Sequence, residues 1–147
     1  PIVMNVIQSL ELTAKQENRH IHVAIEGELT LSAEPKYLEI VLANLIGNAI
    51  KYTKGIAGGQ ISVRAAHRGG RIRISVIDNG IGIPANEKAK LYDKFIRASN
   101  ARRMSPEGTG LGLFIVRRIM EAHGGLFGVK SVPNQGSEFW VEFAKTI

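Results

Sequence analysis

Two dense glycine clusters constrain this chain more than any other feature: one closes an apolar strand pattern and one opens a helix pattern. The first is the run DNGIGIP from Asp78 to Pro84, and the second is GTGLGL from Gly108 to Leu113. Glycine lets another group approach the backbone closely and adopts positive φ at little cost. Bare N–H groups ahead of a helix attract anions. Either cluster alone matches many turns, but in combination with a third motif they predict an anionic ligand.

The third motif lies in a helix predicted from Pro35 to about Tyr52. Its positions Asn44, Asn48, Lys51 and Tyr52 follow each other at steps of four, three and one. At about 100° per residue these side chains cluster on one side of the helix, beside its apolar face. The amide oxygen of Asn48 can bind Mg²⁺, a cation that prefers oxygen ligands; the alternative is an ordinary solvated or core asparagine.

The remaining patterns predict an α/β (α+β) fold. Strand patterns cover 20–25, 60–66, 71–78, 126–131 and 137–143, with a short one at 29–31, and helix patterns cover 2–17, 110–123 and short pieces of 85–95. This order predicts a two-layer sandwich in which helices cover one face of a mixed sheet. The buried helix positions are predicted to be Leu38, Val41, Leu42, Leu45, Ile46, Ala49 and Ile50, and then Leu111, Gly112, Ile115, Val116, Ile119 and Met120.

Composition narrows the class of protein. The 147 residues are predicted to form one domain. The absence of cysteine excludes disulfides and thiolate metal sites and fits a cytosolic protein. No apolar run approaches the roughly 20 residues of a membrane span. The net charge of +6 suits an anionic ligand, an acidic partner or simply a soluble basic surface. Because aromatic residues do not interleave with the basic ones, nucleic-acid binding is not favoured.

Each candidate site residue also has an ordinary structural interpretation. Asp78, at a strand end, can accept a hydrogen bond from an amine such as that of adenine, or it can form a turn before Asn-Gly. Lys51 can reach a phosphate or remain a surface lysine, and Tyr52 can lie near a nucleoside or simply pack. The polar loop 97–107 contains Arg97, Arg102 and Arg103, any of which can contact a γ-phosphate or stay solvated.

The three motifs, in this order and spacing, resemble the ATP-binding catalytic domain of bacterial sensor histidine kinases. That domain belongs to a superfamily shared with DNA gyrase, ATP-dependent heat-shock chaperones and mismatch-repair ATPases. The resemblance runs from about Glu34 to Phe143. Residues 44–53 resemble the asparagine box, 78–82 the first glycine box and 108–113 the second. Phe95 falls in the phenylalanine box, and the runs HGG at 123–125 and GSEF at 136–139 are also similar to family sequence.

The resemblance implies a Bergerat-type fold that binds ATP and Mg²⁺. It implies that Asp78 binds adenine, that Asn48 holds Mg²⁺, that Asn44 and Lys51 act near the phosphates, and that 97–107 forms the ATP lid. The other implied nucleotide-binding positions are Tyr52, Gly80, Gly82, Ile83, Arg97, Gly108, Thr109, Gly110, Leu111 and Gly112. One departure is Glu34, which stands where the family has aspartate; glutamate is a poorer N-cap, so the helix is expected to fray slightly.

Asn44 separates two subclasses of this superfamily. The superfamily's hydrolases carry a water-activating glutamate four residues before the metal-binding asparagine, whereas Asn44 cannot act as a base at neutral pH. The sequence therefore predicts a kinase domain that donates the γ-phosphoryl group of Mg-ATP to a histidine on a separate dimerisation domain. The alternatives are an anti-sigma-factor serine kinase and a non-enzymatic nucleotide-binding module of the same superfamily.

The resemblance also implies an architecture for the parent protein. Residues 1–18 would be a helix near the connection to a dimerisation and histidine phosphotransfer domain of the same chain, and a response regulator would act downstream. The isolated domain is expected to be monomeric and cytoplasmic, and its parent homodimeric, with an inner-membrane anchor in the parent left open.

Overall fold

The computed structural model describes residues 8, 21–26, 33–53, 58–82 and 112–144. Among these residues, five segments with alternating apolar residues form strands and two amphipathic segments form the helices Pro35–Tyr52 and Gly112–Ala122. In chain order the elements are β1 (Ile21–Ile25), α2 (Pro35–Tyr52), β2 (Ile61–Arg68), β3 (Arg71–Asp78), α4 (Gly112–Ala122), β4 (Leu126–Val132) and β5 (Gly136–Ala144). Apart from residue 8, the predicted helix 2–17 lies outside the described residues, as do the strand 29–31, the segment 85–95 and the loop 97–107.

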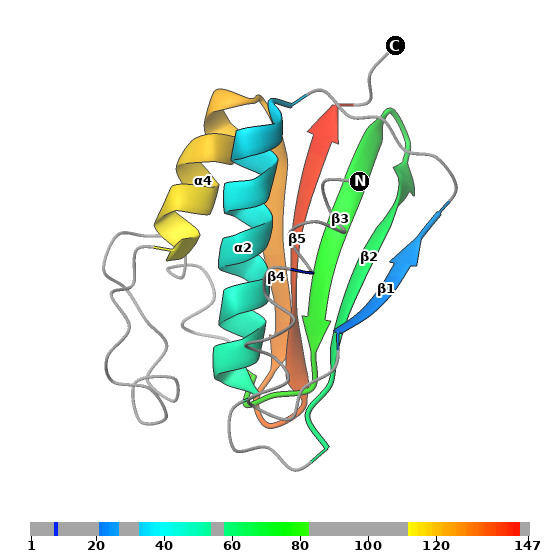
Figure 1. Ribbon diagram of the computed structural model, residues 1–147, viewed down its shortest axis with the longest axis vertical. Coiled ribbons are helices and arrows are strands. Elements are labelled where there is room, and N and C mark those ends of the chain that lie inside the picture. Colours follow the sequence, from blue (N-terminus) through cyan, green and yellow to red (C-terminus); the bar gives the residue numbers. More distant parts are fainter. Residues whose placement is uncertain (1–7, 9–20, 27–32, 54–57, 83–111, 145–147) are drawn as a thin grey trace.

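The strands form one mixed sheet in the order β1-β2-β3-β5-β4 (Figure 1). β1 pairs with β2 in parallel, whereas the other neighbours are antiparallel. β2 and β3 form a hairpin with a two-residue Gly69–Gly70 turn, and Gly69 takes φ +64° as such a turn requires. The five longer predicted strands are therefore confirmed, with ends that differ by one or two residues, while the short strand 29–31 stays a prediction.

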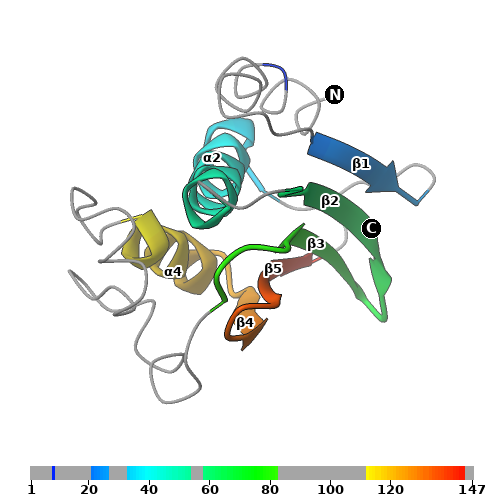
Figure 2. The ribbon, with the colours of Figure 1, turned by 90° about the horizontal axis from the view of Figure 1, so that it is seen from below.

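Both helices lie on the same face of the sheet (Figure 2), which confirms the predicted two-layer arrangement. The core between the layers takes alternate residues from the inner strands, among them Ile74, Val76 and Val141. Helix α2 lies over the middle of the sheet, and every apolar residue predicted for its inner face is buried. Within the described residues, neither helix combines the length and the apolarity needed to cross a bilayer.

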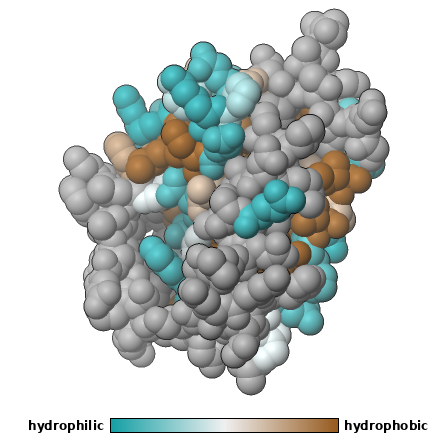
Figure 3. Space-filling model, in the orientation of Figure 1, coloured by the Kyte–Doolittle hydropathy of each residue, from teal (hydrophilic) through white to brown (hydrophobic). Residues whose placement is uncertain are grey.

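The predicted inner face of α4 is partly wrong. Val116, Ile119 and Met120 are buried as expected, but Ile115 is 40% exposed and Leu113 takes a buried position instead. At about 100° per residue Ile115 lies roughly 100° from the middle of the buried stripe, so it sits on the flank of the helix. In Figure 3 hydrophobic surface appears over the helical side of the molecule. Leu111 lies outside the described residues.

The two ends of α2 are held differently. At its start Glu34 makes no side-chain capping hydrogen bond, as the sequence predicts, and its carboxylate lies 3.8 Å from Lys36 Nζ. At its end the Thr53 hydroxyl donates to the Ala49 carbonyl over 2.8 Å. The backbone N–H of Ile81 then donates to the Tyr52 carbonyl over 3.1 Å. This last bond joins the C-terminal end of α2 to the first glycine cluster.

Candidate functional site

Asp78 ends β3 with its carboxylate turned into the protein. The residue is 5% exposed, and its Oδ1 accepts the Gly80 backbone N–H over 2.9 Å. Its Oδ2 is buried and has no hydrogen-bond partner among the described residues. Asp78 is thus the turn-forming residue of one interpretation, and it also keeps an oxygen available to a donor, as the other interpretation requires.

Burial raises the pKa of Asp78 from 3.8 to about 6, and the backbone N–H groups of Gly80 and Ser137 partly offset that effect. A buried acceptor without a partner destabilises a fold by about 1–3 kcal/mol, and more when it is charged. Such groups are rare in native proteins, and each one calls for an explanation. A bound ligand that donates an N–H to Oδ2 would supply the missing hydrogen bond.

The first glycine cluster is packed against the protein's own backbone. A Cβ at Gly80 would overlap the Tyr52 carbonyl, and one at Gly82 would overlap the Val132 carbonyl. Gly82 also takes φ +68°, a conformation that side-chain-bearing residues rarely adopt. The space at both glycines is therefore taken by protein backbone, which explains why glycine is needed here, and their role in nucleotide binding stays a prediction.

Side-chain and backbone hydrogen bonds hold the same loop in place. The Asn79 amide donates from Nδ2 to the Gly58 carbonyl over 3.0 Å, and its Oδ1 accepts the Gln60 N–H over 2.6 Å. The Asn134 N–H donates to the Ile81 carbonyl over 2.6 Å. The strand end that carries Asp78 is thereby fixed to its neighbouring loops.

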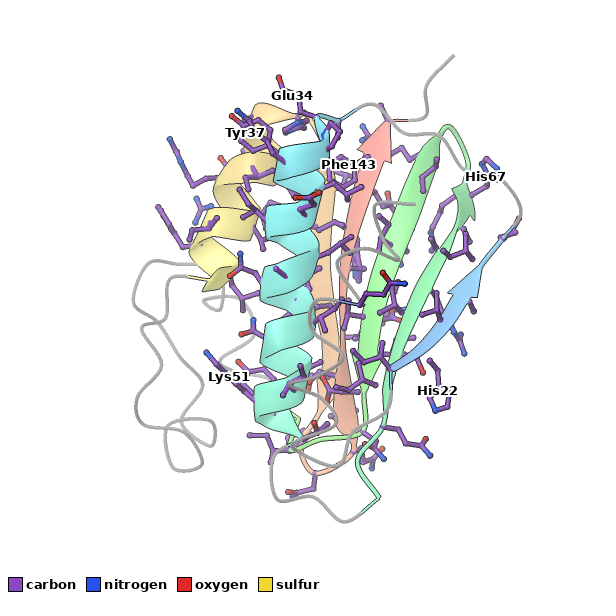
Figure 4. The ribbon with its side chains drawn as sticks, in the orientation of Figure 1. His22, Glu34, Tyr37, Lys51, His67 and Phe143 are labelled. Atoms are coloured by element: carbon purple, nitrogen blue, oxygen red, sulfur yellow. The ribbon has the colours of Figure 1, made fainter. Side chains whose placement is uncertain are left out.

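A polar stripe runs along one side of α2 and consists of Asn44, Gly47, Asn48 and Lys51. Asn44 and Asn48 are half-buried, while Lys51 is exposed and projects to the side of α2 on which α4 lies (Figure 4). Asn44 Nδ2 donates to the Ile40 carbonyl over 2.8 Å. A Cβ at Gly112 would lie 2.8 Å from Asn44 Oδ1, so a larger first residue of α4 would displace the Asn44 side chain. The structure thus brings the asparagine motif against the start of the helix that follows the second glycine cluster.

The Tyr52 ring packs in the core, and its predicted place near the nucleoside stays a prediction. It is 9% exposed, and its ring centroid lies 6.2 Å from that of Phe139. The remaining predicted positions lie outside the described residues: Ile83, Arg97, Gly108, Thr109, Gly110 and Leu111. They stay predictions.

Two serines beside Asp78 were missed by sequence reasoning. Ser137 is the cross-strand neighbour of Asp78, and its hydroxyl lies 2.8 Å from that of Ser131. Because Ser131 donates to the Gly136 carbonyl over 2.9 Å, the Ser137 hydroxyl is the donor in the pair. The Ser137 hydroxyl therefore donates to Ser131 and not to Asp78, so Asp78 Oδ2 receives no hydrogen bond from it. The only signal in the sequence was the GSEF run, which marks Ser137 but not Ser131.

Gly47 gives a prediction about the open side of the stripe. Nothing lies within 4 Å of a Cβ built at Gly47. Since glycine inside a helix is less stable than alanine by about 0.5–1 kcal/mol, Gly47→Ala is expected to stabilise the chain by that amount. Urea unfolding of the two proteins measures the difference. A lower midpoint for Gly47→Ala would mean that the space is filled by another part of the chain.

Comparison with known proteins agrees with these features. Residues 33–147 match the family profile described as histidine kinase-, DNA gyrase B-, and HSP90-like ATPase. The sensor protein GacS of Pseudomonas syringae pv. syringae is 42% identical over 118 residues, which are 77% of this chain and 13% of GacS.

Solved structures extend the likeness to the fold. The catalytic domain of the histidine kinase ThkA, in a nucleotide-free form, is 30% identical with a TM-score of 0.84, and the match covers 99% of this chain and 91% of that domain. Full-length ShkA in complex with AMPPNP is 32% identical with a TM-score of 0.83, covering 99% of this chain and 30% of ShkA. ThkA has also been solved in complex with the response regulator protein TrrA, at 26% identity, a TM-score of 0.80, and coverage of 99% of this chain and 40% of ThkA.

The match to GacS covers about an eighth of that protein, whereas the match to the ThkA catalytic domain covers nearly all of that domain. The chain therefore belongs to the histidine kinase-, DNA gyrase B- and HSP90-like ATPase family, as an ATP-binding domain of the histidine kinase type.

Proposed function

We propose that this domain binds Mg-ATP between the end of β3, the polar stripe of α2 and the start of α4, and donates the γ-phosphoryl group to a histidine of a dimerisation domain in its parent protein. The observation that carries the proposal is the buried Oδ2 of Asp78, which lacks a donor among the described residues. The 6-amino group of adenine is a neutral donor of the required kind, and a hydrogen bond to a charged acceptor contributes about 1.5–3 kcal/mol.

The stripe on α2 supplies the residues for the phosphate end of the nucleotide. Asn48 offers a half-buried amide oxygen, the type of ligand that Mg²⁺ takes alongside its retained waters. Lys51 offers an exposed ammonium group one turn away. When bound, Mg²⁺ would neutralise charge on the phosphates. Asn44, Asn48 and Lys51 would orient those phosphates, which is the main work of a protein in phosphoryl transfer.

Asn44 favours transfer to a protein acceptor over hydrolysis. Its amide donates to the Ile40 carbonyl, and its oxygen faces Gly112. An amide has no basic lone pair at neutral pH and cannot activate water. The complexes of ShkA with AMPPNP and of ThkA with TrrA support an ATP ligand here and a response regulator downstream. The parent histidine domain, its dimerisation and a cytoplasmic location belong to the same proposal.

Labelled phosphoryl transfer tests the function. The chain is incubated with γ-³²P-ATP and Mg²⁺, with and without the helical dimerisation domain of its parent. The domain alone is expected to bind ATP, hydrolyse it well below the roughly 1 s⁻¹ of slow ordinary enzymes, and remain unlabelled. The dimerisation domain is expected to gain an alkali-stable, acid-labile label. An acid-stable label would favour the serine kinase instead, and no transfer at all would favour a non-enzymatic module.

The metal role of Asn48 gives a separate prediction. Asn48→Ala is expected to weaken Mg-ATP binding while leaving the binding of Mg²⁺-free ATP within about twofold, because the amide contacts the ion and not the base. Titration with a fluorescent ATP analogue, with Mg²⁺ and then with EDTA, measures both affinities. Glu39→Ala, at an exposed position of the same helix outside the polar stripe, is the control for a general change in α2. Equal losses with and without Mg²⁺ would contradict the metal role.

A further inference from the structure

The face of the sheet opposite the helices is cationic over β2, β3 and the middle of β4. No described helix covers it (Figure 2), and it contains a shallow pocket of about 290 Å³. The floor of the pocket is formed by Ala66 and Ser75. Its walls are formed by four cationic side chains, those of Arg64, Arg68, Arg73 and Lys130, together with the carboxylate of Glu138. We call this feature the cationic sheet pocket.

Strand register explains how the pocket arises. Arg64 in β2 lies opposite Ser75 in β3, and Ala66 lies opposite Arg73. Because side chains alternate between the two faces of a strand, Arg64, Ala66 and Arg68 all project to the outer face. Small residues therefore alternate with arginines across the hairpin, and a depression forms between long cationic side chains.

Part of the cationic rim is fixed by neighbours. Arg73 Nε and Nη2 both lie 2.7 Å from Glu142 Oε1, and the guanidinium lies 4.0 Å from the centroid of the Trp140 ring. Arg68 Nε lies 3.7 Å from the same carboxylate oxygen. Trp140 can lie flat at this place because its neighbour Gly128 has no side chain; a Cβ there would overlap the indole ring. Arg73 is thus held in place before any partner arrives.

The other part of the rim is free to bind. Arg64 and Lys130 are exposed, and within the described residues neither of them makes an ion pair. Lys130 lies opposite Glu138 in the register, yet the two do not come within the 4 Å of an ion pair. Arg64 and Lys130, which make no ion pair within the part of the chain that the structure describes, flank the fixed Arg73, and the buried carboxylate of Glu142 is already shared by Arg68 and Arg73.

We infer that the cationic sheet pocket docks an acidic segment of a partner protein, one that presents at least two carboxylates to Arg64 and Lys130. Charge complementarity selects the partner, because arginine forks match carboxylate geometry and a surplus of cations faces solvent. Nucleic acid is a poorer match because the Arg73 guanidinium lies over the Trp140 ring and occupies a face on which a base would stack.

The pocket and the nucleotide site lie on opposite faces of the sheet. The stripe of α2 contacts the start of α4 on the helical face, whereas Arg64, Arg73 and Lys130 project from the other. An acidic segment can therefore bind while Mg-ATP occupies its own site. The inference does not depend on the proposed function, and either can fail without the other.

The test uses the whole 147-residue chain and a fluorescein-labelled hexaglutamate peptide, read by fluorescence anisotropy at about 0.15 M ionic strength, where distant surface charges are screened. Saturable binding is expected. The double substitution Arg64→Glu with Lys130→Glu is expected to weaken it about tenfold or more, the loss that one or two charged hydrogen bonds predict. The matched control is Lys36→Glu with Arg118→Glu, an equal charge change at exposed positions of the two helices, which is expected to change the Kd less than twofold.

Each other outcome overturns the inference. Equal weakening by both double variants would show general attraction to a basic protein. Tighter binding of inorganic tripolyphosphate at the same residues would show a phosphate site, and absence of saturation would show no site. Unchanged near-ultraviolet circular dichroism and an unchanged midpoint of urea unfolding verify that the variants fold. If the charge reversals disturb the sheet, Arg64→Gln with Lys130→Gln repeats the test and is expected to weaken binding in the same direction.

Discussion

Asp78→Asn is expected to weaken ATP binding about ten- to a hundredfold while the fold stays intact. The amide keeps the shape of the carboxylate but replaces an acceptor with a donor, and a charged hydrogen bond of about 1.5–3 kcal/mol is lost. Titration with a fluorescent ATP analogue measures the affinity, and circular dichroism verifies the fold. Glu138→Gln, which neutralises a carboxylate on the other face of the sheet, is the control and is expected to bind ATP normally. An unchanged ATP affinity of Asp78→Asn would mean that Asp78 forms the turn but does not bind the nucleotide.

The same substitution is expected to stabilise the nucleotide-free protein in a pH-dependent manner. The pKa of Asp78 is raised from 3.8 to about 6 in the fold, chiefly by burial. The stability that the protonated Asp78 carboxyl contributes is therefore fully present below about pH 3.8. It is lost as pH rises through about 6. At pH 8 the ionised carboxylate destabilises the fold by about 3 kcal/mol, and Asp78→Asn removes that cost.

Urea unfolding at pH 4, 6 and 8 measures this dependence. The variant is expected to exceed the parent chain in stability most at pH 8 and least at pH 4. A difference of the opposite sign, or one that does not change with pH, would mean that the carboxylate is not buried without a partner. Saturating ATP is expected to narrow the gap, because the nucleotide stabilises only the protein that binds it.

Gly82→Ala is the second large effect and acts on the fold. The residue takes φ +68°, and its missing side chain makes room for the carbonyl of Val132 and the Cα of Pro133. Positive φ alone costs a non-glycine residue about 1–2 kcal/mol. Because both obstructing groups are backbone and held by the turn at Asn134, we expect a total loss of at least about 3 kcal/mol.

Gly69→Ala is the matched control for this prediction. Gly69 takes φ +64°, and nothing lies within 4 Å of a Cβ built there. Gly69→Ala therefore measures the cost of positive φ alone, about 1–2 kcal/mol, without the additional cost of a steric clash. Thermal or urea unfolding of both variants gives the two values. If Gly82→Ala costs no more than Gly69→Ala, the contact with the β4–β5 turn does not restrict the first glycine cluster.

Periodic patterns predicted the layers of this fold well. Helix α2 and the β2–β3 hairpin were placed within two residues because their apolar repeats are long and regular. The inner face of α4 was assigned less well. Its apolar residues surround more than half of the helix, so Ile115 and Leu113 could be distinguished only by what packs against them.

The sequence identified candidate residues of the site, but it did not identify the contacts that each of them makes in the fold. The sequence identifies Asp78 as a candidate acceptor, yet whether its second oxygen is satisfied depends on β5, and Ser137 and Ser131 come together only through strand pairing. The glycines of the first cluster were assigned to a ligand, whereas their neighbours Tyr52 and Val132 come from distant elements. Such contacts are long-range in sequence and leave no local pattern.

Amide NMR of the whole chain during titration with Mg-AMPPNP tests the central claim most directly, because it reports where the nucleotide binds. We predict shift changes at Asp78, Gly80 and Gly112 and along the C-terminal half of α2, with the amides of Arg68 and Arg71 at the far end of the β2–β3 hairpin unchanged. Changes centred on that hairpin, or a spectrum that does not change at saturating nucleotide, would contradict a nucleotide site at the end of β3.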